Sequence, residues 1–137
     1  MEIKGKCHCE SFRFDLLWPI EVRGVARRCS CGFCTAFGAA WISNPDATLE
    51  LPKDYMEKIK IYRFGHETAD FCFCKICGVL CVATCHVAGR TRSVVNVSSL
   101  EYPNGFFKKL VRTDFSKESE SQRFARRERN WSPVHVL

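Results

Sequence analysis

The segment Cys74-Lys75-Ile76-Cys77-Gly78 has the spacing of a zinc knuckle, in which two thiolates three positions apart hold one ion across a tight turn. The glycine after the second cysteine permits the positive φ that such a turn needs. A redox-active cysteine pair has the same spacing, but it opens a helix within a βαβ unit, and no such unit surrounds Cys74. We therefore predict that Cys74 and Cys77 bind a metal.

A second pair, Cys7-His8-Cys9, lies at the N-terminus. In an extended strand the Cα atoms of Cys7 and Cys9 would lie about 6.6 Å apart, whereas two sulfurs on one zinc ion lie roughly 3.8 Å apart. The chain must therefore turn sharply here, and Gly5 just upstream can help. We predict one closed, structural zinc site, the four-cysteine cluster, made of Cys7, Cys9, Cys74 and Cys77. His8 is expected to point away from it.

Three more cysteines fall within the six residues Cys29-Ser30-Cys31-Gly32-Phe33-Cys34, and the local backbone offers no fourth ligand. We call Cys29, Cys31 and Cys34 the three-cysteine cluster. A catalytic zinc keeps three protein ligands and one exchangeable position. Three thiolates leave the site with a net negative charge, which blunts its Lewis acidity toward water and suits a soft ligand such as a substrate thiol. The alternative is a second structural site, and the candidates for its fourth ligand are Cys72, Cys81, Cys85, His66 and His86.

Length and composition narrow the class of protein. At 137 residues we expect one domain, residues 1–137, and 46% hydrophobic residues with eleven phenylalanines can fill a modest core. This composition excludes a disordered segment and a free-standing zinc finger. No apolar run approaches the length of a membrane span, and the polar segment 1–10 predicts no secretory signal, so we expect a cytoplasmic protein without membrane contact. Ten cysteines in that compartment indicate metal binding rather than disulfides.

The hydrophobic pattern predicts a mainly β chain. The expected strands lie at 11–15, 58–64, 78–83 and 93–97. One helix is expected over 122–129, because Ser119 and Gln122 form a capping box in front of good helix formers. We expect Cys72, Cys81 and Cys85 to be buried free thiols that act as small hydrophobic residues.

Basic residues give the chain a formal charge of +6. They gather at Arg23, Arg27 and Arg28, at Lys108, Lys109 and Arg112, and at Arg123, Arg126, Arg127 and Arg129. Glutamates interleave with the last group, which is typical of a solvated helical face, and we favour that interpretation. The alternative is an anionic partner such as nucleic acid or an acidic ligand.

The order of these motifs resembles the glutathione-dependent formaldehyde-activating enzyme family, also called the centromere protein V domain. The resemblance rests on three cysteine motifs in sequence order: Cys7-x-Cys9 with Gly5 before it, Cys29-x-Cys31-x-x-Cys34 with Gly38-Ala39 after it, and Cys74-x-x-Cys77. Val95-Asn96-Val97 and Leu100-Glu101 complete the match. It covers residues 3–102, and residues 103–137 form a less diagnostic C-terminal extension. A glycine usually follows the first pair in that family, where this chain has Glu10.

The resemblance implies a β-tent fold of small coiled antiparallel sheets braced by zinc, here with a short C-terminal helix. It implies two zinc ions per chain, a structural one on the four-cysteine cluster and a catalytic one on the three-cysteine cluster. The family activity is addition of glutathione to formaldehyde to give S-(hydroxymethyl)glutathione, a carbon–sulfur lyase reaction in reverse. We expect a small thiol and a small aldehyde as partners. The alternative is a zinc-stabilised module without catalysis that binds protein or nucleic acid.

Overall fold

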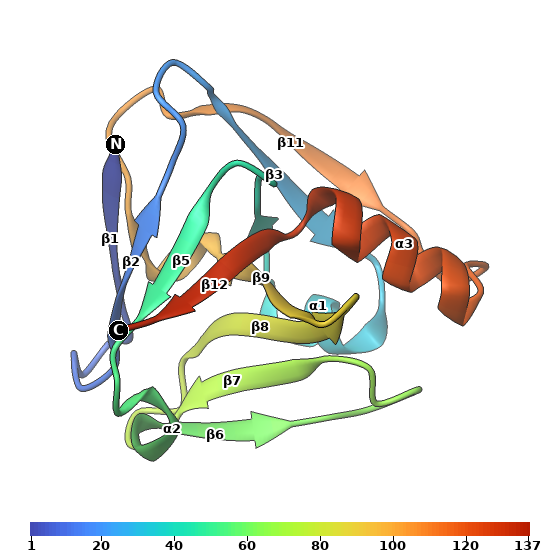
Figure 1. The fold of residues 1–137 in the computed structure, drawn as a ribbon, viewed down its shortest axis with the longest axis horizontal. Helices are drawn as coiled ribbons and strands as arrows, with labels where there is room; N and C mark the ends of the chain where they lie inside the picture. The colour runs from blue at the N-terminus through green and yellow to red at the C-terminus, as the bar shows by residue number, and fades with distance from the viewer.

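The computed structural model describes residues 1–137 and confirms the mainly β class, with a strongly curled sheet and a C-terminal helix (Figure 1). The strands are β1 Glu2–Lys6, β2 Arg13–Leu17, β3 Gly24–Cys29, β4 Trp41–Ile42, β5 Thr48–Leu51, β6 Ile59–Tyr62, β7 Asp70–Cys74, β8 Leu80–Val87, β9 Arg90–Asn96, β10 Leu100–Glu101, β11 Phe107–Thr113 and β12 Ser132–Val136. The helices are α1 Gly32–Phe37, α2 Tyr55–Lys58, the 3₁₀ turn η1 Val97–Ser99 and α3 Glu120–Asn130.

Hydrogen bonding joins the strands in the order β10-β1-β2-β5-β12-β9-β4-β3-β11, and the meander β6-β7-β8 attaches to β9. Strand β9 is the branch point. It pairs with β8 along one edge, while its other edge pairs first with β12 and then with β4. The sheet therefore splits at β9, which leaves room between its arms.

Most strand pairs are antiparallel, but two are parallel, β3 with β11 and β5 with β12. The expected antiparallel pairing therefore holds for most of the sheet, and these two parallel pairs are additions to it. Both contain a strand from the C-terminal extension, which adds its strands beside β3 and β5 after long connections. A long connection permits parallel pairing, whereas a tight hairpin enforces antiparallel pairing.

The fully buried side chains form two groups. The larger includes Phe12, Leu16 and Val82 and extends to the buried Cys7 and Cys74. The smaller surrounds Trp41 and Trp131 and includes Cys34. Each cysteine cluster therefore borders its own hydrophobic core, and burial of each core depends on the loops that the cysteines hold. Cys72, Cys81 and Cys85 are buried, as expected.

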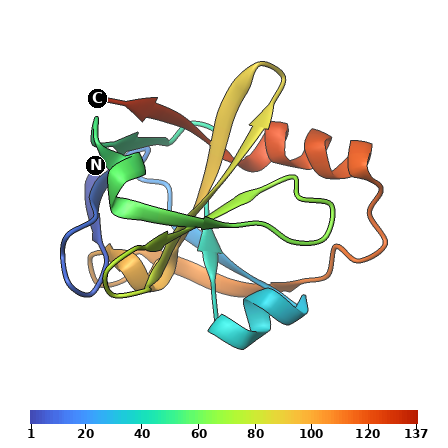
Figure 2. The ribbon, with the colours of Figure 1, turned by 90° about the horizontal axis from the view of Figure 1, so that it is seen from below.

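Helix α3 has the predicted capping box, with the Ser119 side chain accepting from the backbone of Gln122 and the Gln122 side chain accepting from the backbone of Ser119. It lies at the end of the molecule away from the two chain termini (Figures 1 and 2). Helix α1 was not expected, because its six residues are too few to show a helical period. It ends at Gly38, whose φ is 59°.

Candidate functional site

The four predicted sulfurs of the four-cysteine cluster meet where the turn after β1 approaches the turn between β7 and β8. All four Sγ atoms lie within 4.8 Å of one another. Cys9 Sγ lies 3.6 Å from Cys7 Sγ and 3.7 Å from Cys74 Sγ. Sulfurs bound to one tetrahedral zinc are separated by roughly 3.8 Å, so these separations fit a metal ion. His8 is exposed and does not join the cluster, as expected.

Hydrogen bonds around the four-cysteine cluster favour the thiolate form of Cys74. Burial opposes ionisation of this thiol, but bonds to Ser11 Oγ and to the backbone N–H groups of Cys77 and Ile76 outweigh it and lower the pKa of Cys74 to about 6. Burial raises the pKa of Cys7. The hydrogen-bond donors around Cys74 are typical of the second layer of groups around a metal-bound sulfur.

The three-cysteine cluster lies at the junction of β3 and α1. Strand β3 ends at Cys29, Cys31 caps α1, and Cys34 occupies the first turn of that helix. The three Sγ atoms lie within 4.8 Å of one another, and no fourth Cys, His, Asp or Glu joins them. The five candidates for a fourth ligand (Cys72, Cys81, Cys85, His66 and His86) are therefore outside the group. The chain offers three ligands here and no more.

Each sulfur of the three-cysteine cluster accepts one N–H hydrogen bond. Cys29 accepts from the backbone of Cys31 at 3.5 Å, and Cys31 accepts from the backbone of Cys34 at 3.4 Å. Cys34 accepts from the indole Nε1 of Trp41 at 3.4 Å. A hydrogen bond from the Cys34 thiol is the largest of the effects that lower the pKa of Cys29 to about 5, and the charge of Arg126 adds to it. The same bond raises the pKa of Cys34.

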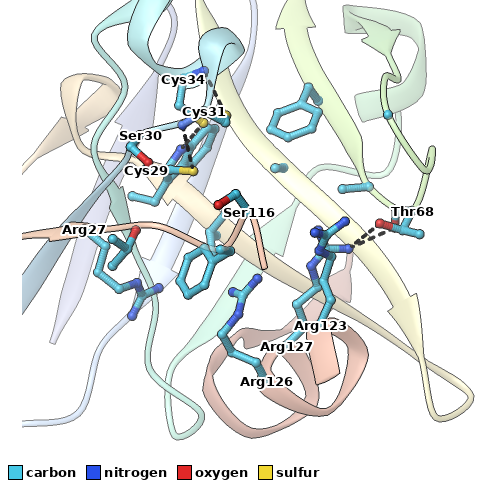
Figure 3. A pocket seen from close by; sticks show the side chains of 18 of the residues that line it. Arg27, Cys29, Ser30, Cys31, Cys34, Thr68, Ser116, Arg123, Arg126 and Arg127 are labelled. Carbon is cyan, nitrogen blue, oxygen red and sulfur yellow. Dashed lines mark hydrogen bonds between the residues drawn. The ribbon is translucent and has the colours of Figure 1, made fainter. Parts of the chain in front are cut away.

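The three-cysteine cluster opens on a cavity of about 520 Å³. Its walls come from the strands β3, β4, β7, β8 and β9, from α1 and α3, from the loop after β6, and from the end of β11 with the loop that follows it. Four arginines line it, called here the arginine wall: Arg27, Arg123, Arg126 and Arg127. Figure 3 shows the cysteines together on one side of the cavity, with the three arginines of α3 on the facing side.

The prediction of a solvated helical face is wrong for three of the four basic residues of α3. The side chains of Arg123 and Arg126 are only 19% and 17% exposed, and Arg127 is 8% exposed. Only Arg129 is exposed as expected. Residues 123, 126 and 127 are spaced i, i+3 and i+4, so they share one helix face. That spacing was the available signal, but the alternating glutamates concealed which face is buried.

Aromatic residues also line the cavity. Trp41, Phe71 and Trp131 are buried or half-buried there, with Phe64 and Phe115 at the margins. They limit the access of water to the sulfurs and strengthen any charge interaction inside the cavity. Trp41 is buried and also contacts the three-cysteine cluster. Its contact with Cys34 depends on β4 pairing with β3, which no sequence motif indicates.

Both cysteine groups can hold a metal ion. Both groups have closely spaced sulfur ligands, which is a feature of a soft-metal site. In the three-cysteine cluster each sulfur also accepts from an N–H donor, as metal-bound sulfurs do. The four-cysteine cluster can fill all four coordination positions of a tetrahedral metal ion by itself. The three-cysteine cluster leaves one coordination position for a ligand from the cavity. The two sites therefore differ in what they can do chemically.

No protein-family model matches the chain, and no curated protein does. The chain is similar to a solved structure, the crystal structure of a Rhodobacter sphaeroides protein determined as a Northeast Structural Genomics target. The two are 29% identical, the match covers 80% of this chain and 99% of that one, and the TM-score is 0.54. None of the helices is long and apolar enough to pass through a membrane.

Proposed function

We propose that the protein is a zinc-dependent enzyme of the carbon–sulfur lyase class, which joins a small thiol to a small aldehyde. Glutathione and formaldehyde are the first candidates, because the cysteine motifs resemble the glutathione-dependent formaldehyde-activating family. One observation carries the proposal. Three cysteine sulfurs without a fourth protein ligand lie in the wall of a cavity large enough for a small organic molecule.

The two zinc ions have different roles in this proposal. The four-cysteine cluster would hold a structural ion, and the three-cysteine cluster would hold the catalytic one. When bound, the catalytic ion supplies a coordination position that lowers the pKa of an incoming thiol. The N–H groups that donate to the sulfurs of Cys29, Cys31 and Cys34 spread the negative charge of these ligands and fix their orientation.

The cavity residues contribute binding and positioning. The arginine wall attracts an anionic thiol, and the aromatic lining around Trp41 and Trp131 excludes water from it. The reaction forms a bond between the thiol sulfur and the carbonyl carbon. The thiol loses one proton and the carbonyl oxygen gains one, so that no oxidant or reductant is needed. No pair of residues is placed as a dedicated acid and base, and proximity is the main contribution of the chain.

Cobalt substitution tests the proposal. Co²⁺ in a thiolate site has charge-transfer bands that change when a new sulfur binds. We expect glutathione to alter these bands in the wild-type protein and not in Cys31→Ser, while both proteins keep the band of the four-cysteine cluster. Two metals per chain with no spectral response to glutathione would contradict the proposal. An assay for S-(hydroxymethyl)glutathione then tests the reaction itself.

A second candidate function is a module that binds a polyanion such as nucleic acid. The observation that favours it is a basic strip along the parallel pair β3 and β11, where Arg28 and Arg112 are register partners. The strip is fully exposed and comprises Arg23, Arg28, Lys108, Lys109 and Arg112. Gel-shift titrations over a salt series distinguish the candidates, because binding to nucleic acid weakens linearly in the logarithm of salt concentration. Binding that is absent at low salt excludes this function.

A further inference from the structure

The C-terminal extension forms the side of the cavity that faces the cysteines. Its contributions to the lining are Thr113, Asp114, Phe115, Ser116, Arg123, Arg126, Arg127 and Trp131. The resemblance to known enzymes ends near residue 102, before the first of these. A ligand that fills the cavity therefore contacts both the cysteines and a segment that lies outside the matched motifs (Figure 3).

Arg126 is held in place before any ligand arrives. Its Nε and Nη2 donate to the two carboxylate oxygens of Glu118 at 2.9 and 3.0 Å, and its guanidinium carbon lies 3.6 Å from the ring centroid of Phe115. A guanidinium has five N–H donors, so Arg126 keeps donors beyond the two that Glu118 uses. Little side-chain entropy remains to be lost when it binds a ligand.

Arg27 and Arg127 line the same cavity, and neither forms a salt bridge with a carboxylate. Arg27 donates to Ser43 Oγ. Arg127 donates from Nη1 to the carbonyl and hydroxyl of Thr68 and to Cys85 Sγ, but its buried Nε has no hydrogen-bond partner. A guanidinium stays charged at neutral pH, and a buried charge without a counter-ion is unfavourable. An anion in the cavity would offset that cost.

The charges around the cavity do not balance. Four guanidinium groups line it, and the nearby carboxylates are Glu118, which pairs with Arg123 and Arg126, and Asp114. Asp114 is exposed and accepts a hydrogen bond from the backbone of Ser116. The arginines therefore exceed these carboxylates by two charges, and a zinc ion held by three thiolates, with a net charge of −1, would leave one positive charge over. The aromatic lining of the pocket weakens screening of that charge by water.

We propose that Arg27, Arg126 and Arg127 form a carboxylate-binding subsite, which makes the protein selective for thiols that carry a carboxylate at the end remote from the sulfur. This inference rests on the proposed function for the place where the sulfur binds, and it adds the residues that select the rest of the molecule. The planar fork of an arginine matches the two oxygens of a carboxylate. The C-terminal extension thereby sets the specificity of the site.

A series of three thiols tests the subsite in the cobalt-substituted protein. The thiols are 3-mercaptopropionate, 2-mercaptoethanol and cysteamine, which are anionic, neutral and cationic beyond the sulfur. We expect 3-mercaptopropionate to bind about tenfold more tightly than 2-mercaptoethanol, since one charge-assisted hydrogen-bonded pair contributes about that factor. Cysteamine should bind most weakly. Equal dissociation constants for all three would overturn the subsite while leaving the proposed function intact.

Variants of α3 assign the selectivity to named residues. We expect Arg126→Gln to bring the ratio of the dissociation constants of 2-mercaptoethanol and 3-mercaptopropionate close to one, whereas Arg126→Lys keeps part of the preference for 3-mercaptopropionate. Arg129→Gln is the matched control, because it removes one positive charge from an exposed position of the same helix. Circular dichroism and metal content verify that each variant is folded. A loss in Arg129→Gln equal to that in Arg126→Gln would overturn the assignment.

Succinate separates the two proposals, because it has carboxylates and no sulfur. Calorimetric titration of the zinc-loaded protein should show succinate binding that Arg126→Gln weakens by about tenfold. If succinate binds in this way but no thiol changes the cobalt bands, the proposed function fails and the subsite stands. If thiols change the bands but succinate does not bind, the subsite fails and the proposed function stands.

Discussion

Trp41 Nε1 donates a hydrogen bond to Cys34 Sγ across 3.4 Å. The other two sulfurs of the three-cysteine cluster accept from backbone groups of the motif itself, but this donor is a side chain from β4. Cys34 is also the buried member of the cluster. The pairing of β4 with β3 therefore places the third N–H donor beside the cluster. The effect of this donor can be tested by a substitution that changes no metal ligand.

Trp41→Phe keeps the aromatic ring and removes the N–H group. We expect the affinity of the three-cysteine cluster for zinc or cobalt to fall about tenfold, the lower end of the effect of losing a second-layer partner. A competition titration with a chelator of known affinity measures this change. Trp18→Phe is the matched control, because its indole donates to the carbonyl of Val22 instead. Equal losses of metal affinity in both variants would rule out a specific role for Trp41.

Cys74→Ser and Cys31→Ser should have different consequences. Cys74 is buried and joins the β7–β8 turn to the N-terminal segment, so loss of its metal should lower the melting temperature by about 10 °C or more. Cys31→Ser should lose one metal per chain and keep the fold, since the smaller core around Trp41 and Trp131 remains packed. Thermal melts with metal analysis test both. Unfolding of both variants to the same extent would remove the distinction between a structural and a functional cluster.

The cysteine spacing was sufficient to predict which sulfurs meet, because the seven cysteines lie in three short segments and only the two pairs together supply four ligands without dividing a segment. The four expected strands correspond to β2, β6, β8 and β9, with ends shifted by up to four residues. Gly5 was expected to ease a turn, but its role is packing. A Cβ at Gly5 would lie 2.1 Å from the ring of Phe14 on the neighbouring strand, a contact that depends on strand register.

The cavity could not be predicted from the sequence in the same way. It forms from segments between residues 27 and 131, and only the cysteines among its lining residues belong to a motif. The spacing of the arginines in α3 shows that they share one helix face. It does not show whether that face is buried or solvated, because glutamates alternate with the arginines. Strand β11 and the following loop bring α3 toward the cysteines, and this placement follows from the parallel pairing of β11 with β3.

Glu118→Gln should change the pH dependence of stability. Hydrogen bonds from Arg126 are the main cause of the lowered pKa of Glu118. A carboxylate with a lowered pKa in the folded state stabilises the fold above its ordinary pKa near 4.5, and this contribution is lost as the pH falls through the lowered value. We therefore expect Glu118→Gln to be less stable than wild type by about 1 kcal/mol at pH 7, a value for a partly exposed charged pair. The difference should shrink below pH 4.5.

Urea unfolding between pH 3 and pH 7 measures this difference. Acid also releases metal from thiolates in both proteins, so the difference between the two curves, rather than either curve alone, reports on Glu118. Glu128→Gln is the control, because Glu128 is exposed on α3 and forms no salt bridge. A stability difference that stays constant over the whole pH range would show that the Glu118 charge is not responsible.

Glu10 follows Cys9 in the left-handed region, with φ at 66°, and its N–H donates to the carbonyl of Cys7 to close the turn. This conformation costs a residue with a Cβ roughly 1–2 kcal/mol, and glycine adopts it freely. We therefore expect Glu10→Gly to be more stable than Glu10→Ala by about 1 kcal/mol. Both variants lose the carboxylate that pairs with Lys6 and Arg13, so this loss cancels in the comparison.

Glu57 provides the opposite case, because it is exposed in α2 with ordinary helical geometry. There glycine should be less stable than alanine by roughly 0.5–1 kcal/mol, since alanine has the higher helix propensity. Urea unfolding of the four zinc-loaded variants gives both differences under one set of conditions. If the glycine variant is less stable than the alanine variant at position 10, as it is expected to be at position 57, the turn after Cys9 does not require a positive φ. In that case the four-cysteine cluster can close around its metal without strain from Glu10.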